Sequence, residues 1–303
     1  MGLFTKGNLL FSILLSFSLM TYSDTLFYGK INSSFENTEK DKSSNSDFKN
    51  NASRIGVKGN FKIKEGLNIS FQIENEIDPT DGRADGDKVF KERNTFIAIE
   101  GDLGKVFLGT YDTAFKISQM KVDLFNDTRA DIKYILRGEN RVNSFFGYTS
   151  PEFVQGLNMS FNSVNQSTGN GESASLNYSR DNIKTSIAIE QNLKGYDGQR
   201  FSIMFPFGGM YFGLLYQSSK KLSNAKSYSG HVISVKRKIS NKGSIYAQNA
   251  KSDMKIISGS QNSLGYEYKI NNSTKMFVHY SRLKQELSID NEIFTSIGFE
   301  YKF

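Results

Sequence analysis

The chain has 303 residues, a formal net charge of +7, no cysteine and a mean hydropathy of −0.45. The absence of cysteine excludes a disulfide framework and any thiolate site. Beyond the N-terminal region, no segment approaches the ~20 consecutive apolar residues that a transmembrane helix needs, which excludes a helical membrane protein. Membrane-spanning strands remain compatible with this hydropathy, because they bury only every second residue in lipid.

The N-terminus has the features of an export signal. Lys6 precedes an apolar run from Leu9 to Met20, and the small residues Thr21 and Ser23 occupy the minus-three and minus-one positions of a cleavage site. The run is too short for a spanning helix. We therefore expect residues 1–23 to be a signal peptide and residues 24–303 to form one domain, with a net charge of +6 once Lys6 is lost from the total of +7. The alternative is a buried N-terminal helix.

Alternation of apolar and polar residues continues along the rest of the chain. Ile55, Val57 and Phe61, for example, alternate with polar or small residues in the manner of a strand with two different faces. The pattern predicts sixteen strands, near 25–35, 52–63, 67–77, 93–100, 105–111, 142–150, 157–165, 172–180, 183–191, 199–206, 210–218, 227–239, 244–251, 260–270, 275–284 and 294–303.

The connections between these strands differ in length from one gap to the next. Every second gap is a tight turn such as Lys64-Glu65-Gly66, and the gaps between are longer and polar, the first from Glu36 to Asn51. Short turns on one rim and long loops on the other are typical of membrane barrels, whereas a soluble sandwich has no reason to separate them. The sequence thus predicts an all-β fold, a 16-stranded antiparallel transmembrane β-barrel.

The longest gap, from Asp112 to Asn140, combines acidic and apolar residues. Apolar side chains such as Phe115, Val122 and Leu136 argue that this loop packs against something, which a disordered loop would not need. Its carboxylates are candidates for a polar site, namely Asp112, Asp123, Asp127, Asp131 and Glu139.

Several segments resemble the trimeric general diffusion porins of Gram-negative bacteria. Leu26 to Lys30 is similar to the first porin strand, Ser53 to Gly59 to the second, and Arg93 to Gly101 to the fourth. Tyr111 to Phe115 resembles the start of the third porin loop, and Arg141 to Ser144, followed by Tyr148 to Phe153, resembles the segment after it.

The resemblance implies a homotrimer in the outer-membrane lipid, with an aqueous pore in each subunit that an inward-folded third loop narrows. It also implies a basic wall opposite that loop, whose matching residues are Lys30, Arg54, Arg93 and Arg141. Charges of opposite sign facing each other across the pore would sort ions and orient dipolar solutes, and we expect a weak preference for anions that fades as salt rises.

The last strand, 294–303, alternates strictly and ends on an aromatic residue. A strand at a chain end must pair with something, and closing a barrel removes the free edge. Phe299, Tyr301 and Phe303 share one face. An apolar-out strand that ends in Phe is also the C-terminal pattern of bacterial outer-membrane barrels, which implies an assembly signal and an outer-membrane location.

The expected function is therefore passive diffusion of small hydrophilic solutes and ions, with no cofactor, metal, enzymatic activity or nucleic-acid partner. A substrate-specific channel is the main alternative. An outer-membrane hydrolase is less favoured, because only His231 and His279 are available as imidazole bases and both fall inside strands. A soluble adhesin or lectin sandwich is disfavoured by the loop pattern and the terminal Phe303.

Overall fold

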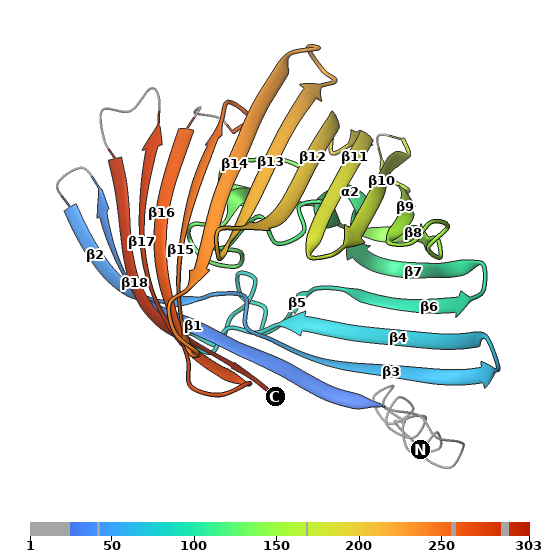
Figure 1. Ribbon diagram of the computed structural model, residues 1–303, viewed down its shortest axis with the longest axis horizontal. Helices are drawn as coiled ribbons and strands as arrows, with labels where there is room; N and C mark the ends of the chain where they lie inside the picture. The colour runs from blue at the N-terminus through green and yellow to red at the C-terminus, as the bar shows by residue number, and fades with distance from the viewer. Residues whose placement is uncertain (1–24, 41–42, 168, 256–258, 286–290) are drawn as a thin grey trace, which may run out of the picture.

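The computed structural model describes residues 25–40, 43–167, 169–255, 259–285 and 291–303, so the expected signal peptide lies outside the described residues. Antiparallel strands form one continuous sheet that curves around a central space (Figure 1). The strands are β1 (Leu26–Lys40), β2 (Ser43–Asn50), β3 (Arg54–Lys64), β4 (Leu67–Glu76), β5 (Lys91–Glu92), β6 (Thr95–Gly101), β7 (Gly104–Asp112), β8 (Arg141–Thr149), β9 (Leu157–Val164), β10 (Gly171–Arg180), β11 (Ile183–Leu193), β12 (Tyr196–Phe207), β13 (Met210–Lys221), β14 (Ser227–Lys238), β15 (Gly243–Ser252), β16 (Gly259–Lys269), β17 (Thr274–Gln285) and β18 (Asn291–Lys302).

These 18 strands make a closed barrel of sixteen wall strands. β2 and β3 both pair with β1 as successive parts of one wall strand, and β5 and β6 both pair with β4 in the same way, so 18 − 2 gives sixteen. β1 pairs along its other edge with β18, which closes the ring. The strand number and antiparallel order predicted from the sequence are confirmed.

The seam between β1 and β18 extends to the C-terminal residue. Lys30 lies opposite Lys302, and the backbone N–H groups of Gly29 and Phe303 each donate to the other residue's carbonyl. The Phe303 ring packs beside Phe27 and over the open face of Gly29, where a Cβ atom would lie only 2.3 Å from the ring. The last aromatic residue therefore takes part in closing the barrel.

The two faces of the wall have the polarity of a membrane barrel. In β18, the apolar side chains Ile297, Phe299 and Tyr301 point outward and are about half exposed, while Ser296 and Glu300 are buried on the inner side. This is the reverse of a soluble domain, and it places the apolar face where lipid would cover it. Within the described ranges, no helix is both long and apolar enough to cross a bilayer.

The connections at the rims of the barrel differ from the sequence-based prediction at two places. The predicted loop from Glu36 to Asn51 is wrong: β1 continues to Lys40 and pairs with β2. Cross-strand contacts explain the extension, because Phe35 lies opposite Phe48 with ring centroids 5.3 Å apart. Two residues, Lys194 and Gly195, join β11 to β12 where a longer loop was expected.

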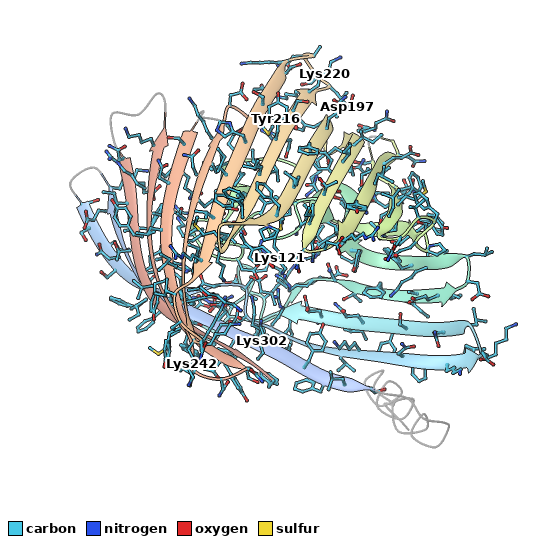
Figure 2. All side chains as sticks on the ribbon, viewed as in Figure 1. Lys121, Asp197, Tyr216, Lys220, Lys242 and Lys302 are labelled. Carbon is cyan, nitrogen blue, oxygen red and sulfur yellow. The ribbon has the colours of Figure 1, made fainter. Side chains whose placement is uncertain are left out.

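The ends of the wall can be followed in Figure 2. Asp197 and Lys220 are cross-strand partners beside the β11–β12 turn, and they lie at the opposite end of the wall from Lys242 and Lys302. Lys242 belongs to the short connection between β14 and β15, so the two rims are those predicted to carry long loops and short turns, respectively.

Candidate functional site

The segment 113–140 between β7 and β8, here called the constriction loop, lies inside the ring of strands (Figure 1). Its outgoing arm (113–127) begins with the short helix α2 (Ala114–Ile117), and its return arm (128–140) contains a 3₁₀-helix, Ile132–Tyr134. Contacts with inward-facing side chains attach the loop to successive strands of the wall, from β9 around to β1.

The first contacts are polar and are made by the start of α2. Thr113 caps the helix, with its side chain accepting a hydrogen bond from the Lys116 amide. The amides of Ala114 and Phe115 donate to Asn162 on β9 and Ser173 on β10. The first N–H groups of a helix lack partners within it, so these wall side chains provide a fixed starting point for the loop.

An apolar contact holds the middle of both arms. Val122, Ile132, Ile135 and Leu136 pack against inward-facing side chains of the wall, which are Leu215 on β13, Val232 on β14, Ala250 on β15 and Met254 beyond it. Gly230 leaves space for this contact, because a Cβ atom there would lie 2.5 Å from Leu136 Cδ2. Burial of several aliphatic side chains, each worth about 1.5–3 kcal/mol, makes this a strong attachment.

Asp123 folds the loop and does not line the opening. Its carboxylate accepts from the amides of Phe125 and Ile132 and from Gln248 Nε2, and only 6% of the residue is exposed. Burial, together with the neighbouring Asp131, raises the pKa of Asp123 well above its usual value. Asp123 was one of the candidate carboxylates for a polar site, and the structure places it away from the cavity, with its three acceptor bonds used within the loop and its wall contact.

Asp131 also organises the loop from within. Its carboxylate accepts from the amides of Asp127 and Lys133, and it pairs with the Lys133 ammonium at 3.3 Å. The residue borders the central cavity but is only 2% exposed. Its main effect is to shape the turn that presents Asp127.

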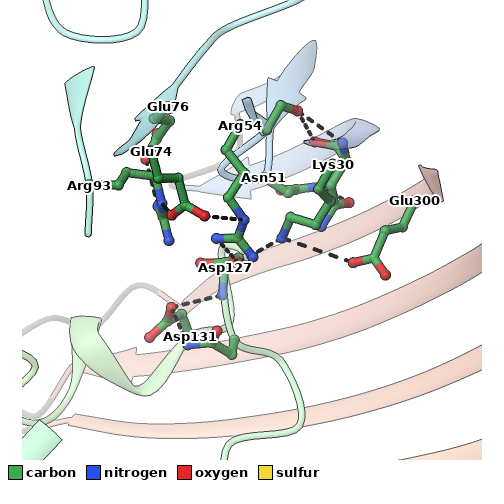
Figure 3. Close-up of polar contacts among 12 residues, drawn as sticks. Lys30, Asn51, Arg54, Glu74, Glu76, Arg93, Asp127, Asp131 and Glu300 are labelled. Atoms are coloured by element: carbon green, nitrogen blue, oxygen red, sulfur yellow. Dashed lines mark hydrogen bonds and ion pairs between the residues drawn. The ribbon is translucent and has the colours of Figure 1, made fainter. Parts of the chain in front are cut away.

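Asp127, at the end of the outgoing arm, reaches the basic wall (Figure 3). Lys30 Nζ donates to Asp127 Oδ2 at 2.8 Å, and Arg54 Nη1 lies 3.6 Å from the same oxygen. Burial acts to raise the pKa of Asp127, but Lys30 and Arg54 outweigh it and lower the pKa to about 2. The loop thus meets the wall through a carboxylate that stays ionised at neutral pH.

The wall charges alternate in sign on both sides of this contact (Figure 3). Arg54 lies 3.8 Å from Glu74, and Arg93 donates to Glu74 at 2.8 Å and to Glu76 at 2.9 Å. In the other direction the chain of ion pairs continues through Glu300, Lys275, Glu267 and Lys236. Most wall charges therefore already have a partner, which leaves a modest field for solutes.

Arg141 is separate from this cluster. Its Nε lies 2.6 Å from Asn94 Oδ1 and 3.1 Å from Asp112 Oδ1, and Asp112 also accepts from Lys116 at 3.0 Å. The structure thus brings Lys30, Arg54 and Arg93 together around Asp127 and Glu74, whereas Arg141 and Asp112 form a second group where the loop leaves the wall.

Glu139 pairs with a residue that the sequence did not single out. Arg200 Nη2 donates to Glu139 Oε1 at 2.9 Å, and the Arg200 side chain is fully buried. Burial raises the pKa of Glu139, and the Arg200 charge opposes that shift. The sequence shows only that Arg200 alternates with outward-facing neighbours and therefore faces the inside of the barrel. Many polar wall residues share this orientation, so it did not single out Arg200.

Between the loop and the wall lies a cavity of about 1840 Å³. Lys30, Arg54, Arg93 and Arg141 border it from the wall, and Asp127 borders it from the loop. Figure 2 shows Lys121, another bordering residue, near the middle of the ring of strands. The arrangement is a polar opening with charges of both signs on facing surfaces.

Comparisons with known proteins agree with this geometry. The structure of the anion-selective porin from Comamonas acidovorans superposes with a TM-score of 0.80 at 19% identity, over 93% of this chain and 100% of that one. The trimer form of OmpT, an outer membrane protein of Vibrio cholerae, gives 0.68 at 14% identity, over 93% of this chain and 100% of that one. At these identities the likeness concerns the fold.

Sequence comparison adds a shorter match. The major outer membrane protein P.IB of Neisseria sicca is 33% identical over 87 residues, which is 29% of this chain and 23% of that protein. A family model described as Gram-negative porin matches residues 13–287, nearly the whole chain. The chain therefore belongs to the Gram-negative porin family and is a β-barrel channel protein of the bacterial outer membrane.

Proposed function

We propose that the protein lets small hydrophilic solutes and ions diffuse passively through a water-filled opening between the constriction loop and the wall of β1 to β8. The observation that carries this proposal is the cavity of about 1840 Å³, which is bordered by charged side chains from both surfaces. Charges that already pair with one another can guide passing ions without holding them tightly, as a diffusion channel requires.

The charge around the opening supports a weak preference for anions. Among the described residues, fourteen Lys or Arg side chains and eight Asp or Glu side chains border the cavity, an excess of six positive charges. Exposed charges act over about 8 Å at physiological salt, so the preference should weaken as salt rises. Lys30, Arg54, Arg93 and Arg141 form the wall of the proposed constriction, and Asp127 and Asp112 are its principal loop-side acids.

The test is the reversal potential of single channels in a planar bilayer under a salt gradient. Replacing Arg54 and Arg141 together with glutamine should move the reversal potential toward cation preference at low salt, because Asp127 and Asp112 each lose a basic partner. Small-solute flux should change only modestly. Arg180→Gln is the matched control, because Arg180 pairs with Asp181 at a short turn and does not border the cavity.

An unchanged reversal potential in the double variant would show that these arginines do not control the opening. Flux that saturates with one solute and not with others would favour a substrate-specific channel. A hydrolase is not favoured: His279 is buried, hydrogen-bonded to Tyr246 and stacked on Phe277, as a packed wall residue would be.

The assembly proposed is a homotrimer embedded in outer-membrane lipid, formed after removal of residues 1–23. Two observations support it: the outward faces of the strands near the seam carry exposed apolar side chains such as Phe27, Ile73 and Phe299, and a porin-like barrel of similar fold occurs in a trimer form. A folded sample should migrate as a trimer on unheated gels and as a monomer after heating. Migration only as a monomer before heating would refute the trimer.

A further inference from the structure

Arg200 lies on β12, far around the wall from β7 and β8, where the constriction loop begins and ends. Its side chain has no exposed surface, and it does not border the cavity. Burying a guanidinium costs free energy unless hydrogen bonds and opposite charges replace its lost hydration. The partners of Arg200 therefore indicate what it does.

Those partners belong to both arms of the loop. Nη1 donates to the carbonyl of Phe115 on the outgoing arm at 3.0 Å. Nη2 donates to the carbonyl of Arg137 at 3.1 Å and to the Glu139 carboxylate at 2.9 Å, both on the return arm. One side chain therefore joins the two arms to each other and to the wall.

A neighbouring wall residue and an aromatic ring complete the contact. Gln217 on β13 accepts from Arg200 Nε at 3.0 Å and donates through Nε2 to the Arg137 carbonyl at 3.0 Å. The Phe115 ring lies 4.4 Å from the guanidinium carbon, and Gly138 leaves room for it, since a Cβ atom there would lie 2.4 Å from the ring. The site is shaped for a flat, forked group.

Lysine could not replace these contacts. The guanidinium supplies donors in several fixed directions, whereas an ammonium group is a compact point charge on a flexible chain. Arg200 uses its fork to reach two backbone carbonyls, a carboxylate and an amide together. The contact therefore depends on shape as well as charge.

We propose that Arg200, supported by Gln217, is a positioning residue that clamps the neck of the constriction loop and so keeps the opening at a constant width. The proposal rests on the proposed channel function. The apolar contact and the Asp127 tip would still tether the loop without this clamp, so its loss should free the neck while leaving the charges that face passing ions in place.

Two variants test the clamp in the full-length protein. Arg200→Lys keeps the charge and removes the fork, and the double variant Arg200→Met with Glu139→Gln removes both buried charges together. Arg180→Lys is the control, because that arginine is half exposed at a short turn. In bilayer recordings, both test variants should close about tenfold more often than the parent, as expected for lost hydrogen bonds to a charged group. The reversal potential of Arg200→Lys should not change, whereas the double variant also loses Glu139, which borders the cavity, and is therefore used only for closure frequency and cleavage rate.

A second readout does not depend on conduction. Trypsin added to detergent-folded barrels should cut the loop at Lys121, Arg129 or Lys133 about tenfold faster in the test variants, because the freed neck lets these sites open more often. Gln217→Leu, a milder change that keeps the Arg200–Glu139 pair, should give a smaller increase and guards against variants that do not fold.

Closure frequency and cleavage rate equal to the parent in folded Arg200 variants would overturn the clamp. A changed reversal potential of Arg200→Lys at unchanged closure frequency would also overturn it, since it would assign Arg200 to the ion path. If the parent protein itself conducts no ions, the proposed channel function fails, and the cleavage rates still decide whether the clamp exists.

Discussion

The inner wall of the barrel has two halves with different roles. From β9 to β15 the constriction loop packs against it, and the inward side chains there include Leu215, Val232 and Ala250. From β1 to β8 it stays open to the cavity, and the inward side chains include Arg54 and Glu74. The covered half binds the loop, whereas the open half faces solutes.

The comparison shows that the inside of this barrel is not uniformly polar. Alternation sets which residues face inward, and several of the inward residues that the loop covers are apolar, such as Leu215 and Val232. The covered half resembles the core of a soluble domain, with glycines such as Gly213 and Gly230 leaving room for the loop. The open half keeps its charges in alternating pairs.

The largest expected effect comes from placing a charge in the covered half. Val232 has no exposed surface and contacts the loop cluster, so Val232→Lys would bury an unpaired ammonium at a cost of about 3–5 kcal/mol. We expect little folded barrel, measured as the heat-modifiable fraction on gels. Thr149→Lys is the matched control in the open half, because Thr149 borders the cavity. Equal folding of the two variants would show that the halves do not differ.

A smaller effect on stability is expected at the seam where the halves meet. Deleting Phe303 removes the ring that packs beside Phe27 and the backbone bonds to Gly29, at most about 2 kcal/mol of apolar burial. If Phe303 is also an assembly signal with Phe299 and Tyr301, outer-membrane levels should fall far more than that loss explains, while export continues. Phe303→Tyr, which keeps an aromatic ring, is the control. Normal outer-membrane levels after the deletion would show that Phe303 is not an assembly signal.

The smallest effect is expected where the loop touches the open half. Asp127→Asn should release Lys30 and Arg54 from their shared carboxylate and strengthen anion preference, opposite in sign to neutralising the arginines. The reversal potential at low salt measures this change, and Arg180→Gln, which alters a pair with Asp181 away from the cavity, serves as a control. A shift of the reversal potential toward cation preference would contradict the proposed effect of the contact between Asp127 and the two basic residues.

The same carboxylate fixes an expected pH dependence. The folded pKa of Asp127 is lowered to about 2, so its pairing stabilises the loop above the unfolded value of 3.8 and is lost as pH falls through the folded value. Reversal potential and closure frequency should therefore show no contribution from Asp127 between neutral pH and about pH 5. A titration step in that range that disappears in Asp127→Asn would contradict the lowered pKa.

The sequence was sufficient to predict the strands of the wall, but it was not sufficient to predict the course of the constriction loop. Period-two alternation depends on neighbouring residues, so it predicted sixteen strands. The course of the loop depends on contacts between distant residues, such as Phe115 with Arg200, which no local pattern records. For that reason the buried role of Asp123 and the importance of Arg200 could not be predicted.

One signal in the sequence did point to the covered half. Leu215, Val232 and Ala250 share the inward phase with Gln217, Ser234 and Gln248, so they break the rule that inward residues are polar. Apolar residues on the phase that faces water in an open channel indicate that something covers them. The hairpin of β1 and β2 was missed for a different reason, because its polar residues resembled a loop until Phe35 and Phe48 were seen to pair.

The seam between β1 and β18 has a consequence for the order of folding. The hydrogen bonds between Gly29 and Phe303 join opposite ends of the described chain, and closing so long a loop is slow compared with forming the neighbouring hairpins. Until that pairing forms, two strand edges with apolar outer faces stay open and can pair with other chains. The barrel therefore passes through a stage that is prone to aggregation, during which a chaperone that shields strand edges would have its greatest effect on yield.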